Sequence, residues 1–375
     1  MKICLIGGHL GPALALLDYV PSHWQVVFLG RQNVFEGDPG LSLEYQAITK
    51  RDIPFYPLTT GRLQRKLTKR TLLSLPKVPV GYLQALRYLR KEKPDVVFGF
   101  GGYVSLSVGL AAKTLGIPVV IHEQTLRAGL ANRFLGRFAE KIYISWESSR
   151  KYFPANKTIV TGNLLRKTII DSLSASKNKK AIGTDPVLYI TGGSAGSHSI
   201  NVIVEEIIER LLGKYTVIHQ TGDALEFGDY TRLIKRRELL PLVLRKKYTI
   251  MKFIEPSDVG EIYRNADLVI SRSGVNTMTE LLVMKKSCLL IPLPHGQRDE
   301  QIENAAYLKE KGLATVLLQK DATGESLLAT IDNIMSHITD FSLNAPVDTS
   351  IHLHAAFHVV DLLGSLYEKK EDKKP

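Results

Sequence analysis

The sequence contains very little cysteine, with only Cys4 and Cys288 among its 375 residues. Both lie in apolar runs far apart in the chain, so we interpret them as buried thiols within strands. Two cysteines cannot build a disulfide framework or a zinc ligand set. This scarcity excludes disulfide-stabilised secreted scaffolds and favours a reducing compartment.

Long hydrophobic runs are absent as well. No stretch of about 18 apolar residues occurs, as a helix that spans a bilayer would require. The amino-terminal sequence MKICLIGGHLGPALALL is broken by glycines and lacks the continuous apolar core of a signal peptide. We therefore expect a cytoplasmic protein that meets a membrane only at its surface.

Acidic residues are scarce in one segment of the chain. Residues 62–93 contain ten basic residues and one acid, Glu92, so this segment carries +9 while the whole chain carries +12. Apolar residues interleave the cations, as suits an anionic headgroup layer in which each cation contributes about 1 kcal/mol. We interpret 62–93 as a contact for an anionic membrane surface and expect no nucleic-acid partner. A solvated helix face and a nucleic-acid-binding patch are the alternatives.

Short apolar runs alternate with helical patterns along most of the chain. The runs lie at 2–6, 24–30, 95–102, 118–124, 141–145 and 158–163, and again at 187–197, 215–222, 248–254, 267–274 and 287–294. They are continuously apolar, which is typical of parallel strands covered on both faces by helices. The polar, lysine-rich stretch within 164–186 interrupts the pattern. The sequence therefore predicts an α/β protein with two doubly wound parallel-sheet domains that face a cleft.

We place the first domain at 1–163 and the second at 164–346. The remaining residues, 347–375, contain an apolar helix that crosses back to the first domain, followed by a disordered lysine-rich tail.

Glycine-containing loops follow four of the predicted strands. They are Gly7-Gly8-His9, Gly99 to Tyr103, Gly192 to Gly196 and Ser273-Gly274. Ligands bind beyond the carboxyl ends of parallel strands, where glycine lets backbone amides approach a phosphate and the next helix adds positive charge at its N-terminus. Two such loops in each half indicate anion sites in both domains.

Several familiar nucleotide and catalytic motifs are missing. Val104 stands where a dinucleotide fingerprint needs its third glycine, and there is no Gly-Lys-Ser/Thr phosphate loop or Gly-x-Ser-x-Gly elbow. No Asp-x-Asp pair is present to hold a metal on a diphosphate. Backbone amides and helix dipoles would then hold the diphosphate without metal.

Two side chains beside these loops are suited to catalysis or binding. His9 follows the first strand directly, and an imidazole with a pKa near 6.5 suits a general base; a polar cap on the next helix is the alternative. Glu280, on the helix after Ser273-Gly274, could accept two hydrogen bonds from a ribose diol. An exposed acid without a ligand is its alternative.

A set of motifs spread over nearly the whole chain resembles the MurG family, which adds N-acetylglucosamine to lipid I on the cytoplasmic face of the membrane. The motifs are GGH at 7–9, GFGGYVS at 99–105, IPVVIHEQ at 117–124, AGLANRFL at 128–135, TGN at 161–163, TGGSAGSHSIN at 191–201, HQTG at 219–222, FI at 253–254, SRSGVNTMTELL at 271–282 and QIENAAYL at 301–308.

The resemblance implies a GT-B fold of two Rossmann-like domains and a metal-independent, inverting transfer. N-acetylglucosamine would move from UDP-N-acetylglucosamine to undecaprenyl-diphosphate-N-acetylmuramoyl-pentapeptide, which forms lipid II in peptidoglycan synthesis. The protein would be peripheral at the cytoplasmic face of the cell membrane.

The resemblance also implies roles for individual residues. His9 would be the catalytic base, Ile254 would meet uracil, Glu280 the ribose, Ser194 the diphosphate and Gln301 the sugar. The full donor-binding set is Gly7, Gly8, Thr125, Arg166, Ser194, Ile254, Val275, Asn276, Thr277, Met278, Thr279, Glu280 and Gln301. The acceptor-binding set is Gly101, Gly102, Tyr103 and Asn132.

The first glycine loop departs from the family pattern. The family has Gly-Gly-Thr-Gly-Gly-His, whereas Gly7-Gly8-His9 is about three residues shorter. Two alternatives therefore stay open: a GT-B transferase that acts on another lipid-linked acceptor, and a non-catalytic nucleotide-sugar-binding subunit that recruits a partner to membranes.

Overall fold

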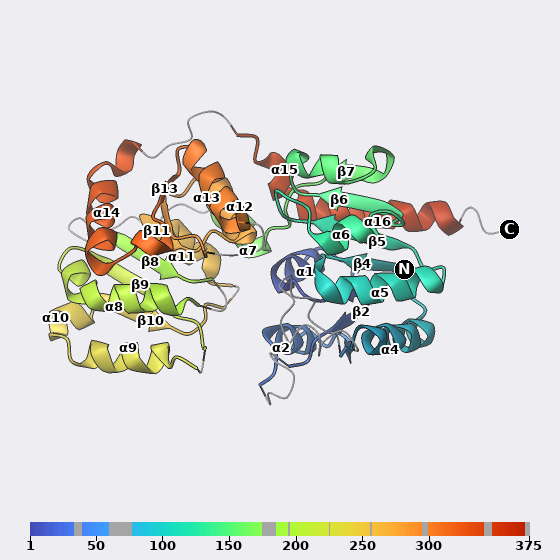
Figure 1. Cartoon of the computed structure of the whole chain (residues 1–375), viewed down its shortest axis with the longest axis horizontal. Helices are drawn as coiled ribbons and strands as arrows, with labels where there is room; N and C mark the ends of the chain where they lie inside the picture. Colours follow the sequence, from blue (N-terminus) through green and yellow to red (C-terminus); the bar gives the residue numbers. More distant parts are fainter. Residues whose placement is uncertain are drawn as a thin grey trace. The chain divides into compact units, whose positions relative to one another are not determined.

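A computed structural model describes residues 1–33, 40–59, 77–174, 185–193, 196–224, 226–255, 257–294, 299–340 and 347–371. These residues form two compact units (Figure 1). Unit 1 comprises residues 1–166 and 350–375, and unit 2 comprises residues 167–349. Residues 62–76 of the basic segment and the donor-site candidate Ser194 lie outside the described residues.

Unit 1 is built around a seven-stranded, all-parallel sheet in the order β3-β2-β1-β4-β5-β6-β7. Its strands are β1 (Lys2–Ile6), β2 (Gln25–Gly30), β3 (Phe55–Pro57), β4 (Val96–Gly99), β5 (Val119–Glu123), β6 (Lys141–Ile144) and β7 (Thr158–Val160). Every residue of β4 and β5 is buried, as the continuously apolar runs predict.

Helices cover both faces of this sheet, because successive side chains of a strand point to opposite faces. Cys4 and Ile6 of β1 join the core under one set of helices, whereas Ile3 and Leu5 join the core on the other face. The first face is covered by α4 (Lys77–Glu92), α5 (Gly102–Thr114) and α6 (Leu130–Leu135). The second is covered by α1 (Leu10–Leu17), α2 (Leu43–Thr49) and α16 (Ala355–Glu371), which follows the short α15 (Ser350–Leu353).

The chain leaves unit 1 later than the boundary expected after Asn163. Leu164 is buried in the same core cluster as Phe98 and Ala355, so it belongs to unit 1. Packing therefore moves the boundary to Arg166.

Unit 2 repeats the design with a six-stranded parallel sheet in the order β10-β9-β8-β11-β12-β13. Its strands are β8 (Val187–Thr191), β9 (Thr216–Gln220), β10 (Tyr248–Met251), β11 (Leu268–Ser271), β12 (Cys288–Leu290) and β13 (Ala314–Val316). Its helices are α7 (Lys167–Ser174), α8 (His198–Leu212), α9 (Asp229–Glu238), α10 (Leu242–Arg245), α11 (Val259–Asn265), α12 (Val275–Val283), α13 (Glu300–Glu310) and α14 (Gly324–Ser336).

Together the two sheets confirm the predicted pair of doubly wound parallel-sheet domains. Both cysteines are buried in strands, Cys4 in β1 and Cys288 in β12, as the sequence predicts. Within the parts of the chain that the structure describes, no helix combines the length and apolar character needed to cross a bilayer.

Candidate functional site

Two glycine loops of unit 1 meet at the carboxyl edge of its sheet. β1 and β4 are neighbours, yet the chain continues from β1 into α1 on one face and from β4 into α5 on the other. Such a reversal is where open α/β sheets bind ligands. The loops touch, because a side chain added to Gly8 would lie 3.6 Å from the Gly101 carbonyl oxygen. Gly8, Gly101 and Gly102 have φ values of +115°, +92° and +79°, which favour glycine.

His9 stands at this meeting point. It occupies the N-cap position of α1, but its side chain makes no capping hydrogen bond, so the alternative of a polar helix cap is not what the structure shows. The ring lies beside the start of α5, where a side chain on Gly102 would be 3.8 Å from His9 Cε1. Although the side chain is exposed, the surrounding protein desolvates the imidazole and lowers its pKa below 6.5. A neutral, accessible imidazole can accept a proton.

Glu44 of α2 supports the first glycine loop and was missed by sequence reasoning. Its Oε2 accepts a 2.8 Å hydrogen bond from the Gly8 amide, and its carboxylate fills the space that a side chain on Gly7 would need. Burial raises the pKa of Glu44, while the Gly8 hydrogen bond and the nearby charge of Arg31 oppose the rise. A single acid in a loop-flanking helix gives no distinctive signal in the sequence.

Tyr103, an acceptor-site candidate, stands in the first turn of α5. The guanidinium of Arg31 lies 5.5 Å from the centre of its ring, close enough for a cation–π contact. Its hydroxyl is buried and has no hydrogen-bond partner among the residues that the structure describes.

Thr125 and Asn132 are held by one carboxylate, that of Glu123 at the end of β5. Glu123 Oε1 accepts hydrogen bonds from the Thr125 amide at 3.0 Å and from its hydroxyl at 2.6 Å. Glu123 Oε2 accepts from Gly129 N at 2.9 Å and from Asn132 Nδ2 at 3.0 Å. Asn132 is buried directly behind Gly101, so in this structure its side chain supports the loop from within.

In unit 2 the principal candidate is the N-terminus of α12. The helix follows the buried strand β11, and its hydrogen-bond ladder begins with Met278 N donating to Gly274 O at 2.9 Å. The amides of the first turn therefore face the carboxyl edge of the sheet and make it electropositive. Asn276 and Thr277 are half-buried there.

The other predicted positions of α12 are buried. Val275 is buried, and Met278 is fully buried. The hydroxyl of Thr279, also fully buried, donates to Val275 O at 2.8 Å within the helix. Glu280 is 4% exposed, so the alternative of an exposed acid is wrong.

Arg272 lies between β11 and α12 and was also missed as a site residue. Its Nη2 donates to Ser197 Oγ at 2.8 Å, Ser199 Oγ at 2.7 Å and Gln319 Oε1 at 2.6 Å, and its Nη1 donates to Ile291 O at 2.9 Å. These partners are all neutral; among the described residues no carboxylate pairs with Arg272. Burial lowers its pKa to about 10. A cation directly after an apolar strand was the available sequence signal.

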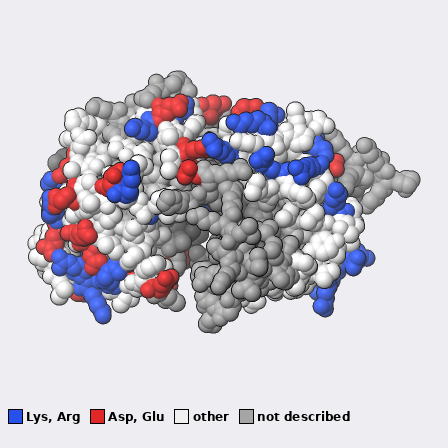
Figure 2. Space-filling view, viewed as in Figure 1, with Lys and Arg blue, Asp and Glu red and all other residues white. Residues whose placement is uncertain are grey.

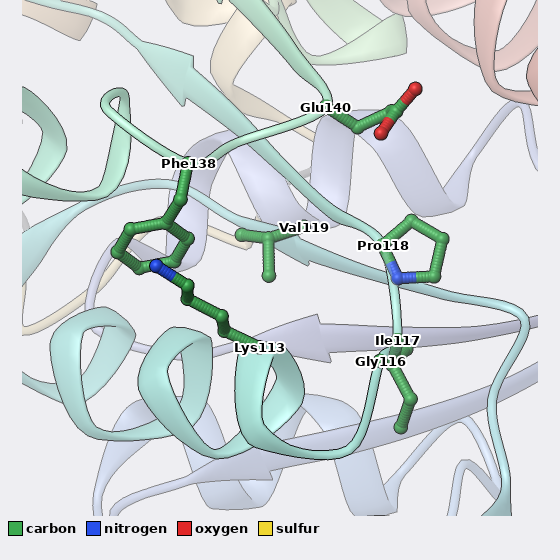
Figure 3. Close-up of a pocket in the computed structure, with 7 residues that line it drawn as sticks. All are labelled: Lys113, Gly116, Ile117, Pro118, Val119, Phe138 and Glu140. Atoms are coloured by element: carbon green, nitrogen blue, oxygen red, sulfur yellow. The ribbon is translucent and has the colours of Figure 1, made fainter.

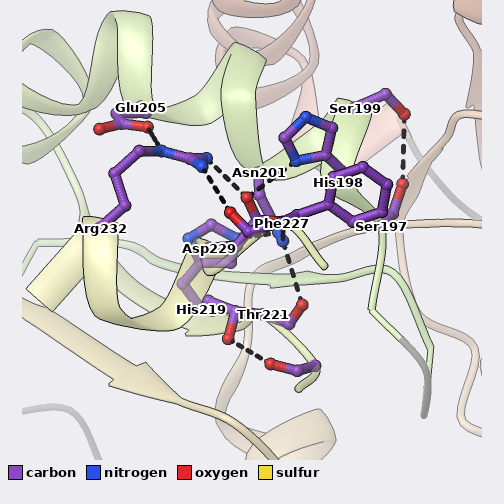
Figure 4. Close-up of polar contacts among 11 residues, drawn as sticks. Ser197, His198, Ser199, Asn201, Glu205, His219, Thr221, Phe227, Asp229 and Arg232 are labelled. Carbon is purple, nitrogen blue, oxygen red and sulfur yellow. Dashed lines mark hydrogen bonds and ion pairs between the residues drawn. The ribbon is translucent and has the colours of Figure 1, made fainter. Parts of the chain in front are cut away.

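A polar network fixes the start of α8 beside the loop after β9 (Figure 4). Asn201 Nδ2 donates to Thr221 O at 3.0 Å and to Asp229 Oδ2 at 2.8 Å. Asp229 Oδ1 also pairs with His198 Nδ1 at 2.8 Å and with Arg232 at 2.7 Å. The network fixes the first turn of α8, which follows the 192–197 glycine loop.

The remaining candidates occupy loops or boundaries. Gln301 Oε1 accepts from Leu293 N at 2.9 Å, while the Gln301 carbonyl accepts from Ser273 Oγ at 2.6 Å, which ties α13 to the loop before α12. Ile254 is half-buried in the loop after the edge strand β10. Arg166 is half-buried at the last position of unit 1.

A small pocket in unit 1 lies away from these loops (Figure 3). It is formed around Pro118 and Val119, at the amino end of β5, and the Lys113 ammonium lies 4.4 Å from the centre of the Phe138 ring. Because ligands of such sheets bind at the carboxyl edge, the glycine loops are the better candidate site.

Comparison with known proteins places both units in one family. Residues 6–144 match the glycosyltransferase family 28 N-terminal domain, and residues 187–355 match the glycosyltransferase family 28 C-terminal domain. The Bacillus cytotoxicus UDP-N-acetylglucosamine–N-acetylmuramyl-(pentapeptide) pyrophosphoryl-undecaprenol N-acetylglucosamine transferase is 32% identical over 336 residues, which cover 88% of each chain. The Geotalea uraniireducens protein of the same name is 34% identical over 339 residues, covering 88% of this chain and 87% of the relative.

A solved structure extends the similarity to the whole fold. The crystal structure of Acinetobacter baumannii MurG matches with a TM-score of 0.66 at 28% identity, covering 97% of this chain and 99% of that chain. Because it matches both family 28 domains and shares 32–34% of its residues with these transferases over 88% of its length, the chain belongs to the MurG family of glycosyltransferases.

Proposed function

We propose that this chain transfers N-acetylglucosamine from UDP-N-acetylglucosamine to undecaprenyl-diphosphate-N-acetylmuramoyl-pentapeptide, forming lipid II. The observation that carries the proposal is a pair of glycine-loop and helix-N-terminus sites, one in each unit, in a chain related over 88% of its length to transferases of that name. Each site presents backbone amides where a diphosphate can bind, and the reaction uses two diphosphates.

Unit 2 is the proposed donor domain. The N-terminus of α12 receives the diphosphate together with Ser194, and Glu280 accepts the hydroxyls of the ribose. The backbone of Ile254 meets uracil, and Gln301 meets the sugar. Arg272 adds a fixed positive charge behind this edge, since its partners among the described residues are neutral.

Unit 1 is the proposed acceptor domain. Gly101, Gly102 and Tyr103 line the acceptor's approach, and Asn132 holds their loop from behind. His9 lies against Gly102 with an exposed ring of lowered pKa, so it is neutral and ready to accept a proton. This arrangement supports His9 as the general base.

The proposed chemistry is a single displacement with inversion. His9 takes the proton of the acceptor's sugar hydroxyl, whose oxygen bonds to the anomeric carbon while the bond to UDP breaks. Negative charge grows on the departing diphosphate and is stabilised by the amides of α12 and by the helix dipole. We propose that no metal takes part.

Exposed side chains of unit 1 support attachment to a membrane. The described part of the basic segment includes α4, on which Val80 and Leu83 are exposed on the same side as the cations Arg87 and Arg90. An apolar and cationic helix face suits the headgroup layer of an anionic bilayer. We propose that the protein is peripheral at the cytoplasmic face of the cell membrane.

A second candidate, a transferase for another lipid-linked acceptor, is favoured by the geometry of the shortened loop. The Gly8 amide is already bonded to Glu44, so it is not offered to a diphosphate, and Glu44 is acidic. A loop altered in this way would suit a different acceptor headgroup.

A radiolabelled-sugar transfer assay tests both candidates. The full chain is incubated with several UDP-sugars and a panel of polyprenyl-diphosphate acceptors, with and without EDTA. We expect transfer from UDP-N-acetylglucosamine to the N-acetylmuramoyl-pentapeptide acceptor, unchanged by EDTA. Transfer only to another acceptor would establish the second candidate, and UDP binding without transfer to any acceptor would establish a non-catalytic subunit.

A further inference from the structure

Unit 2 carries a small group of exposed apolar side chains that the proposed reaction does not use. Leu239, Leu242 and Val243 are 78%, 63% and 70% exposed. They lie on the turn between α9 and α10 and on α10 itself, on the surface of unit 2 (Figure 1). We call these three residues the apolar tip. Such high exposure means that the side chains project from the surface and do not line a groove.

The apolar tip is held in place by its neighbours. Leu240 is 2% exposed and, like Leu244, packs against the core of unit 2, so the exposed residues lie between or beside side chains that anchor the turn. Arg245 Nη1 pairs with Glu238 Oε2 at 3.0 Å, and Arg237 Nε donates to Tyr248 O at 2.8 Å. The turn is thus fixed on both sides, and a fixed apolar projection binds without losing much conformational freedom.

Two exposed lysines flank the apolar tip. Residues 229–247 contain seven basic residues and two acids, and five of the seven, Arg232, Arg236, Arg237, Arg245 and Lys247, form ion pairs with acids of unit 2. Lys and Arg side chains gather over α9 in Figure 2. Lys235 and Lys246, which flank the turn, are exposed and form no ion pair among the described residues.

We propose that the apolar tip docks unit 2 on an anionic lipid surface. The three apolar side chains would enter the boundary between headgroups and acyl chains, and the flanking cations would meet lipid phosphates. The inference goes beyond the proposed function, because it gives unit 2 a membrane contact of its own, separate from residues 62–93 of unit 1.

The size and shape of the tip favour lipid over protein. A stable protein interface uses about 20 to 30 residues on each side. Three projecting side chains are too few for such an interface, but they can insert into a fluid lipid layer. The exposed Lys235 and Lys246 are complementary to anionic lipid.

Site-specific fluorescence tests the proposal directly. Cys4 and Cys288 are the only cysteines and both are buried, so a cysteine introduced by Leu239→Cys can be labelled selectively with an environment-sensitive dye. We expect its emission to shift to the blue on vesicles that contain phosphatidylglycerol. Leu173→Cys, at an exposed leucine on α7, is the matched control and should not shift. An unchanged Leu239→Cys emission would overturn the proposal.

Vesicle sedimentation supplies a second measurement that needs no acceptor or activity. Replacing Leu239, Leu242 and Val243 together by serine should weaken binding to anionic vesicles about tenfold, because apolar area is lost from the contact. Leu173→Ser should bind like the unmodified chain. Equal binding of the triple variant would overturn the proposal. So would a wild-type dimer that the triple variant cannot form, since the tip would then contact a second copy.

Discussion

The backbone amide of Gly8 donates a 2.8 Å hydrogen bond to Oε2 of Glu44, a residue 36 positions away in the sequence. Through this bond the first turn of α2 holds the shortened glycine loop that ends at His9. The carboxylate occupies space left open by the absence of side chains at Gly7 and Gly30, so it also fills the interior beneath the loop. Glu44 therefore positions the proposed base through the backbone of Gly8.

Two substitutions of Glu44 should separate the effect of its shape and hydrogen bond from the effect of its charge. Glu44→Gln keeps an oxygen that accepts from Gly8, so we expect a turnover number within about threefold of the wild type. Glu44→Ala removes the acceptor and leaves a void, and should lower the free energy of unfolding by about 2 kcal/mol. Turnover should fall at least tenfold in this variant. Denaturant unfolding and the transfer assay measure the two effects, and equal behaviour of the two variants would contradict the positioning role.

Removing His9 should affect chemistry more than donor binding. For His9→Ala we expect turnover to fall by about 10² to 10⁴, the usual contribution of a general base, while the affinity for UDP changes less than twofold. Isothermal titration with UDP is the binding control. Turnover equal to that of the wild type would remove His9 from the role of base.

The pH profile of the wild type offers an independent check on His9. Because its pKa is lowered, the imidazole stays neutral from pH 6.5 down to that lowered value. The base is lost only as the pH falls through the lowered pKa. The acidic limb of kcat/KM should therefore have its midpoint below pH 6.5 and should vanish in His9→Ala. A midpoint above 6.5 would argue against this assignment.

Arg272 should contribute to the affinity for the donor diphosphate. Its charge is buried against hydroxyl, amide and carbonyl groups, so an incoming diphosphate would supply the missing negative charge. We expect Arg272→Gln to weaken UDP binding about tenfold or more, measured by calorimetry, with a smaller effect on uridine. Arg264→Gln, which changes a half-buried arginine of unit 2 that pairs with Glu261, is the control. Equal losses for UDP and uridine would point to a structural role alone.

Glu280 should discriminate nucleotides by their ribose hydroxyls. Hydrogen bonds to a charged group contribute about 1.5 to 3 kcal/mol each, so Glu280→Gln should weaken UDP binding about tenfold or more. The affinity for 2′,3′-dideoxy-UDP should be the same in both proteins, because this nucleotide lacks the diol. A matching loss for both nucleotides would place the effect of Glu280 elsewhere.

Local sequence determined the strands at the centre of each sheet and the positions of the glycine loops. Residues 119–121 and 268–270 are apolar at every position because both faces of a central parallel strand are buried. Gly101 and Gly102 mark a turn that needs positive φ. Patterns of this kind can be recognised in the sequence because they depend on residues that are adjacent in the chain.

Tertiary structure alone decided one edge of each sheet and the environment of the site. The edge strands Phe55–Pro57 and Ala314–Val316 are three residues long and were not predicted, because each is defined by hydrogen bonds to a neighbouring strand. The contacts between Glu44 and Gly8 and between Arg272 and Gln319 join residues distant in the chain. The burial of Asn132 behind Gly101 likewise depends on how α6 packs. Such contacts arise only when separate elements pack together, so no local pattern of residue types encodes them.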